Sequence, residues 1–151
     1  MSAEITSYSS DPVRQFSIFT ENRIGRLHDL AALFAEHDVH IVAVTALDTT
    51  HSTILRIVVD DPDRARELMI NNDFPYTEND VLVVSIASEA DLGKILAALF
   101  EAEINIHYLY SFIKRPGEKS ALALHVEYPE EAARCLFLCG HTILGQRDIA
   151  R

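Results

Sequence analysis

Histidine is the residue type of this sequence with the widest capacity for chemistry, because imidazole binds metals and exchanges protons near neutral pH. None of the histidines has the spacing of a zinc motif, either with another histidine or with Cys135 and Cys139, so we predict no metal site. No nucleophile has a base at a recognisable spacing, and no phosphate-binding glycine loop is present. We therefore predict that the protein is not an enzyme and uses no cofactor. The seven histidines are His28, His37, His40, His51, His107, His125 and His141.

The other reactive side chains have structural explanations. The carboxylate pairs Asp60–Asp61 and Glu130–Glu131 lie at the starts of expected helices, where capping and the helix dipole account for acidic residues. Cys135 and Cys139 lie four residues apart on one face of an expected helix, a spacing that disfavours a disulfide within that helix. We predict that both are buried thiols.

Composition and charge exclude several classes of partner. Apolar residues make up 48% of the 151 residues, which is enough to build a core. The formal charge of −10 would repel a phosphate polymer, so we predict no nucleic-acid partner. No apolar run approaches the length of a membrane span, and residues 1–12 lack the basic and apolar regions of a signal peptide. We expect a cytoplasmic protein that does not bind membranes.

The elements that must position any site follow a pattern that occurs twice. In the first half, strand-like residues 13–19 are followed by a polar connector and by Leu27, Leu30, Ala31 and Phe34, which share one helix face. Residues 39–44 and 52–59 predict two further strands. Asp61 is expected to cap a second helix with Pro62 at its first position, and residues 74–78 predict a short last strand.

The second half repeats this order with an offset of 65 residues. Residues 81–86 predict a strand, and Leu92, Ile95, Leu96 and Leu99 repeat the helix face of the first half. Strands are expected at 106–113 and 120–127, Pro129 is expected to open the last helix, and Gly140 to end it in a left-handed conformation. We therefore predict two tandem βαββαβ units of the ferredoxin-like kind, α+β, with antiparallel sheets, helices on one face, and the units packed together.

Residues 19–27, with the sequence FTENRIGRL, precede the first predicted helix, and the strand after it begins with DVHI at 38–41. This arrangement resembles the signature of ACT domains, in which a strand ending in Asn-Arg-Pro-Gly-x-Leu is followed by a helix and a Gly-Ile-Asn-Ile strand. The second half keeps the end of that signature at 104–106. The chain looks like the stand-alone tandem ACT proteins of bacteria. We assign residues 1–11 to an N-terminal extension, 12–78 to the first repeat and 79–151 to the second.

The resemblance implies a regulatory module that holds an amino acid in the seam between paired repeats. One partner supplies the loop before the first helix, and the other supplies an asparagine of its second strand. The first repeat keeps the loop but has His40 at the asparagine position. The second repeat keeps Asn105, whereas its loop has become residues 87–91 and places Asp91 where a ligand carboxylate would dock. We predict one site per chain, formed by Asn22, Arg23, Ile24, Gly25, Arg26, Leu27 and Asn105.

Other interpretations of the same residues stay open. Asn22 and Gly25 are also the residues of a simple turn that caps a helix without any ligand. An alternative function is a ligand-free protein-interaction module, or a regulatory subunit that binds a separate metabolic enzyme. Because open sheet edges favour pairing, we also expect a homodimer or a larger assembly.

Overall fold

The computed structural model describes residues 7–21, 25–49, 52–113 and 119–150. It divides into two compact units. The first unit comprises Arg14–Asn79 together with Ile149–Arg151, and the second comprises Asp80–Asp148 together with the segment that ends at Val13.

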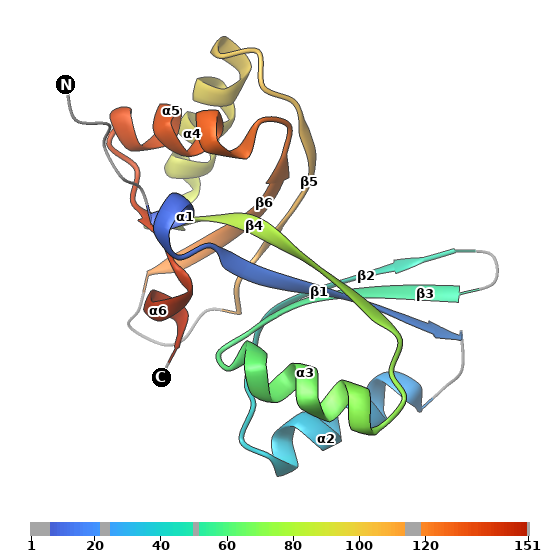
Figure 1. Cartoon of the computed structure of the whole chain (residues 1–151). Helices are drawn as coiled ribbons and strands as arrows, with labels where there is room; N and C mark the ends of the chain where they lie inside the picture. The colour runs from blue at the N-terminus through green and yellow to red at the C-terminus, as the bar shows by residue number, and fades with distance from the viewer. Residues whose placement is uncertain (1–6, 22–24, 50–51, 114–118, 151) are drawn as a thin grey trace. The chain divides into compact units, whose positions relative to one another are not determined.

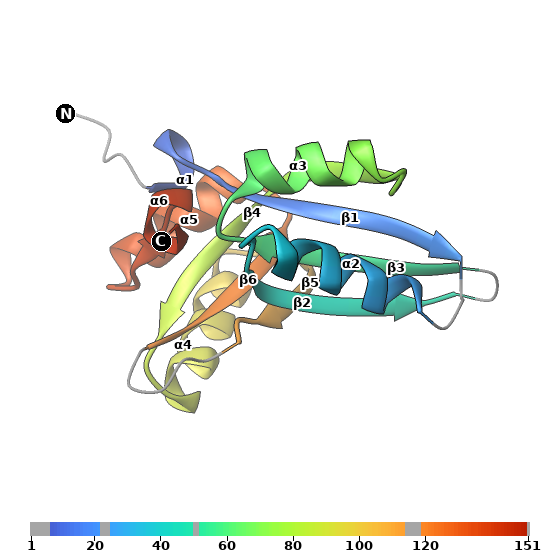
Figure 2. The same ribbon diagram turned by 90° about the horizontal axis from the view of Figure 1, so that it is seen from below.

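The first unit is a sheet with two helices on one face (Figures 1 and 2). Its strand order is β2-β3-β1-β4, and the β1–β3 and β2–β3 pairs are antiparallel. In the β1–β3 pair, Thr20 lies opposite Thr53. The elements are β1 (Val13–Glu21), α2 (Arg26–Glu36), β2 (Ile41–Asp48), β3 (Ser52–Val59), α3 (Pro62–Asn71) and the first part of β4 (Tyr76–Ile86).

The second unit has the same strand order. Its sheet runs β7-β4-β6-β5 with antiparallel pairs, so its first strand again lies between its third and fourth. The order of strand, helix, strand, strand, helix and strand occurs twice, which confirms the predicted ferredoxin-like fold. The elements are α4 (Glu89–Glu101), β5 (Ile106–Ser111), β6 (Ser120–Val126), α5 (Pro129–Leu138) and β7 (Ile143–Leu144), with the four-residue helices α1 (Ser7–Ser10) and α6 (Gln146–Ile149).

Strand β4 belongs to both units. Residues 74–78 and 81–86 were expected to be separate strands with a polar joint near residues 78–80, but the structure has one continuous strand over Tyr76–Ile86. The polar residues of the joint stay extended because strand hydrogen bonding involves the backbone and accepts any side chain with an allowed φ and ψ. The passage from one unit to the other is therefore an extended backbone within β4.

Burial in the two cores supports the offset of 65 residues between the repeats. Leu30 and Phe34 of α2 are buried, and the residues 65 positions later, Ile95 and Leu99 of α4, are buried as well. The tetrapeptide AALF, which occurs at 31–34 and 97–100, would instead suggest an offset of 66. That offset would align Phe34 with Phe100, which is 83% exposed. The two helices therefore present equivalent faces to equivalent cores.

All four long helices end in the same way. The residue after the last turn has a positive φ, and the next N–H donates to a carbonyl five residues earlier, as in the Schellman motif. Gly140 has a φ of 91°, which confirms the predicted left-handed end of α5. In the other three helices the position is occupied by an acidic residue: Asp38, Asp73 and Glu103, with φ of 58–59°.

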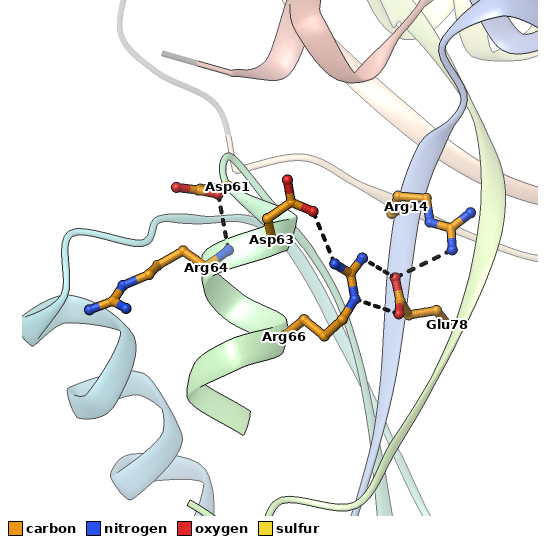
Figure 3. Close-up of polar contacts among 6 residues, drawn as sticks. All are labelled: Arg14, Asp61, Asp63, Arg64, Arg66 and Glu78. Carbon is orange, nitrogen blue, oxygen red and sulfur yellow. Dashed lines mark hydrogen bonds and ion pairs between the residues drawn. The ribbon is translucent and has the colours of Figure 1, made fainter. Parts of the chain in front are cut away.

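Helix α3 begins as the sequence predicts. The Asp61 carboxylate accepts a hydrogen bond from the Arg64 N–H at 3.1 Å, and Pro62 occupies the first turn. Figure 3 shows this cap beside an ionic network that joins α3 to the sheet. Arg66 donates two hydrogen bonds to Glu78 of β4, at 2.7 and 2.8 Å, and one to Asp63 at 2.9 Å.

The segment before β1 packs on the second unit. Tyr8 of α1 contacts that unit's core, and the Asp11 carboxylate accepts from the Arg147 N–H at 2.8 Å. Burial, with Asp80 and Glu130 nearby, raises the pKa of Tyr8. The expectation of two buried thiols is wrong, because Cys135 is partly buried but Cys139 is exposed. Cys139 is the C-cap residue of α5, one position beyond the last residue of the helix.

Candidate functional site

The start of α2 is an open helix N-terminus. Gly25 occupies the capping position with φ 105° and ψ −27°, and no side chain caps the helix. The first intrahelical bond runs from the Asp29 N–H to the Gly25 carbonyl at 2.7 Å. The N–H groups of residues 26–28 precede that bond and have no acceptor within the helix, which makes this end suitable for an anion. A Cβ built on Gly25 would meet no atom within 4 Å, so there is open space beside the glycine.

Arg26 places a positive charge at this helix end. Its guanidinium carbon lies 4.0 Å from the centre of the Phe74 ring, and Phe74 is a buried core residue. Stacking on the ring holds the guanidinium in place and leaves its N–H edge able to bind a carboxylate. No carboxylate forms an ion pair with Arg26 within the part of the chain that the structure describes.

A cavity of about 340 Å³ lies beside Arg26 in the first unit. The Phe19 N–H donates to the Pro75 carbonyl at 2.9 Å, immediately before β4 begins. Beyond that link β1 continues for two residues, which pair with β3 on the other side. The cavity thus lies at the end of the sheet, beyond the last hydrogen bond between the β1 and β4 segments. Its lining residues are Phe19, Thr20, Glu21, Arg26 and Pro75.

The equivalent helix end in the second unit carries a carboxylate that folds back on the backbone before the helix. Asp91, which is 65 positions after Arg26, lies in the first turn of α4 and accepts from the Ala87 N–H at 2.7 Å. This hydrogen bond, with a second from the Ser88 N–H, lowers the pKa of Asp91. Helix α4 also starts two residues earlier than α2 in equivalent numbering. Neither N-cap residue makes a side-chain hydrogen bond, so the two helix ends differ in charge: the second unit has the Asp91 carboxylate where the first has Arg26.

Of the residues predicted for the site, Gly25, Arg26 and Leu27 lie together at the start of α2. Asn22, Arg23 and Ile24 lie outside the described residues. Asn105 is exposed and directly precedes β5 in the second unit, where its carbonyl accepts from the Glu127 N–H at 2.9 Å. Its participation in the same site stays a prediction.

His40 occupies the position equivalent to Asn105 in the first unit. Its carbonyl accepts from the Asp60 N–H at 3.1 Å, which matches the bond made by Asn105. Its backbone N–H donates to the Asp60 carboxylate at 2.8 Å, and its ring Nδ1 lies 2.8 Å from that carboxylate. The side chain of His40 is therefore held by a buried aspartate of its own unit.

Sequence reasoning did not find Phe19, Thr20, Glu21 or Pro75 as members of a site. Phe19, Thr20 and Glu21 directly precede the predicted loop, so a wider window around it would have included them. Nothing in the sequence indicated that Pro75 lines the site, because its position beside β1 depends on how β4 pairs with β1. No group of three metal-ligating side chains occurs among the described residues. No helix in the described ranges is long and apolar enough to cross a membrane.

Comparison with protein families identifies this class of fold. The family model of the ACT domain pair matches residues 12–151. The chain therefore belongs to the ACT domain pair family, and the resemblance inferred from the sequence is confirmed. No curated protein matches the chain.

Solved structures with the same fold include proteins with a regulatory description. Protein BT0572 from Bacteroides thetaiotaomicron is 26% identical, with a TM-score of 0.83 over 93% of this chain and 96% of that one. The regulatory subunit of aspartate kinase from Thermus thermophilus, in a ligand-free form, is 13% identical, with a TM-score of 0.58 over 85% and 91%. The corresponding subunit from Thermus flavus is 16% identical, with a TM-score of 0.56 over 86% and 93%. The chain thus shares its fold with these structures.

Proposed function

We propose that this protein is a regulatory module that binds a free amino acid at the start of α2. The observation that carries the proposal is the contrast between the two helix ends. The first turn of α4 carries the Asp91 carboxylate, which accepts a hydrogen bond from the backbone before the helix, whereas the equivalent position of α2 is Arg26. A ligand α-carboxylate would bind the first N–H groups of α2 and the Arg26 guanidinium.

The charges that line the cavity support a zwitterionic ligand. Arg26 and the N–H groups of α2 suit the α-carboxylate, and the Glu21 carboxylate suits the α-ammonium group. Because the Asp91 carboxylate would repel a ligand carboxylate at the start of α4, we propose one ligand per chain. A solved structure with the same fold is the regulatory subunit of aspartate kinase, which is compatible with such a role. We include the control of a metabolic enzyme in this proposal.

A thermal-shift screen of the full chain against the twenty amino acids tests the function, because a ligand of the native state must raise the melting temperature. Calorimetry with the strongest ligand should give one site per chain. Arg26→Gln should lower the affinity by about ten- to a hundredfold, since it removes hydrogen bonds to a charged group.

Arg134→Gln is the matched control, because Arg134 is an exposed arginine of the other unit and the charge change is the same. It should leave the affinity unchanged. A screen in which no amino acid raises the melting temperature, or an Arg26→Gln variant that binds like the parent, would contradict the proposal. Asn105→Ala, measured in the same way, tests the sequence-based prediction for Asn105.

A second candidate function is protein interaction. Leu96 and Phe100 lie one turn apart on the exposed side of α4, with exposures of 37% and 83%, where the first unit has Ala31 and Ala35. Large exposed apolar residues of this kind are typical of interaction surfaces. Light scattering of the parent and of a Leu96→Ser, Phe100→Ser variant tests self-association. A dimer that the double variant loses, together with a negative ligand screen, would favour this second function.

A further inference from the structure

Thr20 has an unusual position within the cavity. It follows Phe16 and Ile18 on the face of β1 that packs against the helices, so its side chain lies at the end of the core. The residue is only 6% exposed, yet it also lines the cavity. A threonine at this position therefore presents a hydroxyl group where the two preceding core residues present apolar side chains.

The Thr20 hydroxyl has no hydrogen-bond partner among the described residues. Thr53, directly opposite on β3, is also buried, but its hydroxyl donates to the Asp48 carboxylate at 3.4 Å. Buried hydroxyl groups in native proteins are nearly always paired, and an exception calls for an explanation. A ligand in the cavity would provide one.

We propose that the Thr20 hydroxyl hydrogen-bonds the side chain of the bound amino acid, so that the site selects a small polar side chain over an aliphatic one of the same shape. The inference rests on the proposed function, in which Arg26 and the α2 N–H groups take the α-carboxylate and Glu21 takes the ammonium group. Thr20 then remains as the polar group for the ligand side chain. Phe19 and Pro75 form the apolar walls.

The physical basis of this selection is an asymmetry of hydrogen bonding. A hydroxyl or carboxamide on the ligand would pair with Thr20, whereas an aliphatic ligand would fill the same space and leave the hydroxyl buried and unpaired. A site built around such a group discriminates against the analogue that lacks the partner. The ratio of the affinities for a polar ligand and an aliphatic ligand of the same shape therefore measures the contribution of the Thr20 hydroxyl.

The experiment is calorimetric titration of the full chain with isosteric pairs: serine against 2-aminobutyrate, threonine against valine, and asparagine against leucine. In at least one pair the polar member should bind about tenfold or more tightly than the apolar one. Thr20→Val should abolish that preference and bind the apolar member at least as well as the parent does. Thr20→Ser, which keeps the hydroxyl, should retain the preference.

Thr53→Val is the matched control, because Thr53 is the buried cross-strand neighbour of Thr20 and does not line the cavity. It should keep the preference. If the parent protein binds the two members of every pair with equal affinity, the inference is overturned before any variant is measured. A Thr20→Val variant that weakens both members alike would overturn it too, since Thr20 would then contact the ligand backbone. Both results leave the proposed function standing, whereas failure of every amino acid to bind would contradict the function itself.

Discussion

The two repeats share their strand order and their helix ends, but they differ where the first helix of each begins. In the first unit this helix starts at Arg26 after a glycine with a positive φ. In the second unit the helix starts earlier, and Asp91 folds back on the Ala87 N–H. The core positions of the two helices are equivalent, so the difference is confined to residues outside the two cores. A repeated fold can thus keep one architecture while the first turn of the equivalent helix carries an arginine in one copy and a carboxylate in the other.

A second difference concerns how the second helix of each unit is tied to its sheet. The first unit uses Arg66 and Glu78, which the structure places in a two-hydrogen-bond contact (Figure 3). Arg14 of β1 adds a longer contact to Glu78 at 3.4 Å. At the offset of 67 that relates the second helices, the corresponding residues are Ala133 and Gly145. The second unit therefore uses a buried alanine where the first uses an ionic network.

The largest expected effect tests the equivalence of the two cores. Leu99→Ala should lower the free energy of unfolding by about 2–5 kcal/mol, because Leu99 is 1% exposed and its loss leaves a cavity. Phe100→Ala, at the next position, should change it by less than about 0.5 kcal/mol, since Phe100 is mostly exposed. Chemical denaturation measures both. A larger effect at Phe100 would refute the offset of 65.

An intermediate effect is expected for the ionic network of the first unit. Glu78→Gln should lower the free energy of unfolding by about 1.5–3 kcal/mol, because it weakens charged hydrogen bonds to Arg66. The Asp63 side chain is 92% exposed, so Asp63→Asn should lower the free energy of unfolding by only about 0–1 kcal/mol. If the two substitutions had equal effects, the network would not be the link between α3 and β4 that the structure indicates.

The same network predicts a dependence on pH. The hydrogen bonds from Arg66 lower the pKa of Glu78 below its ordinary value of 4.5. The folded state therefore binds this proton less readily than the unfolded state, and the stabilisation is present above the ordinary value. It is lost as the pH falls through the lowered value. Denaturation curves at decreasing pH should show this loss in the parent, and a smaller loss in Glu78→Gln.

The smallest effect contrasts the caps of the second helices. Asp61→Ala should lower the free energy of unfolding by about 0.5–2 kcal/mol, because the Asp61 carboxylate caps α3. The equivalent residue of α5 is Tyr128, which has a φ of 54° and makes no side-chain cap. Tyr128→Gly should stabilise the protein by about 1 kcal/mol, since glycine accepts a positive φ without strain. Melting temperatures that move in the same direction for both variants would contradict this contrast.

Most of the fold could be predicted because its signals are local. The strand over residues 52–59 has the predicted limits, since its β-branched residues favour an extended chain, and the helix that follows starts at Pro62 as predicted because Asp61 caps it. The continuity of β4 was missed because the polar residues 78–80 resemble a loop. The repeated order predicted a last strand in the second unit, but the residues of β7 were not located, since two residues are too few to show alternation.

The sequence by itself determined the repeated order of elements, the offset between the repeats, and the loss of the loop glycine before Asp91. These are properties of residue type and spacing along one chain. Only the tertiary structure decided that Arg26 lies over Phe74, that Pro75 and Thr20 line one cavity, and that the Thr20 hydroxyl has no partner among the described residues. The physical reason is that these contacts join segments distant in sequence, and they exist only once the strands take the order β2-β3-β1-β4.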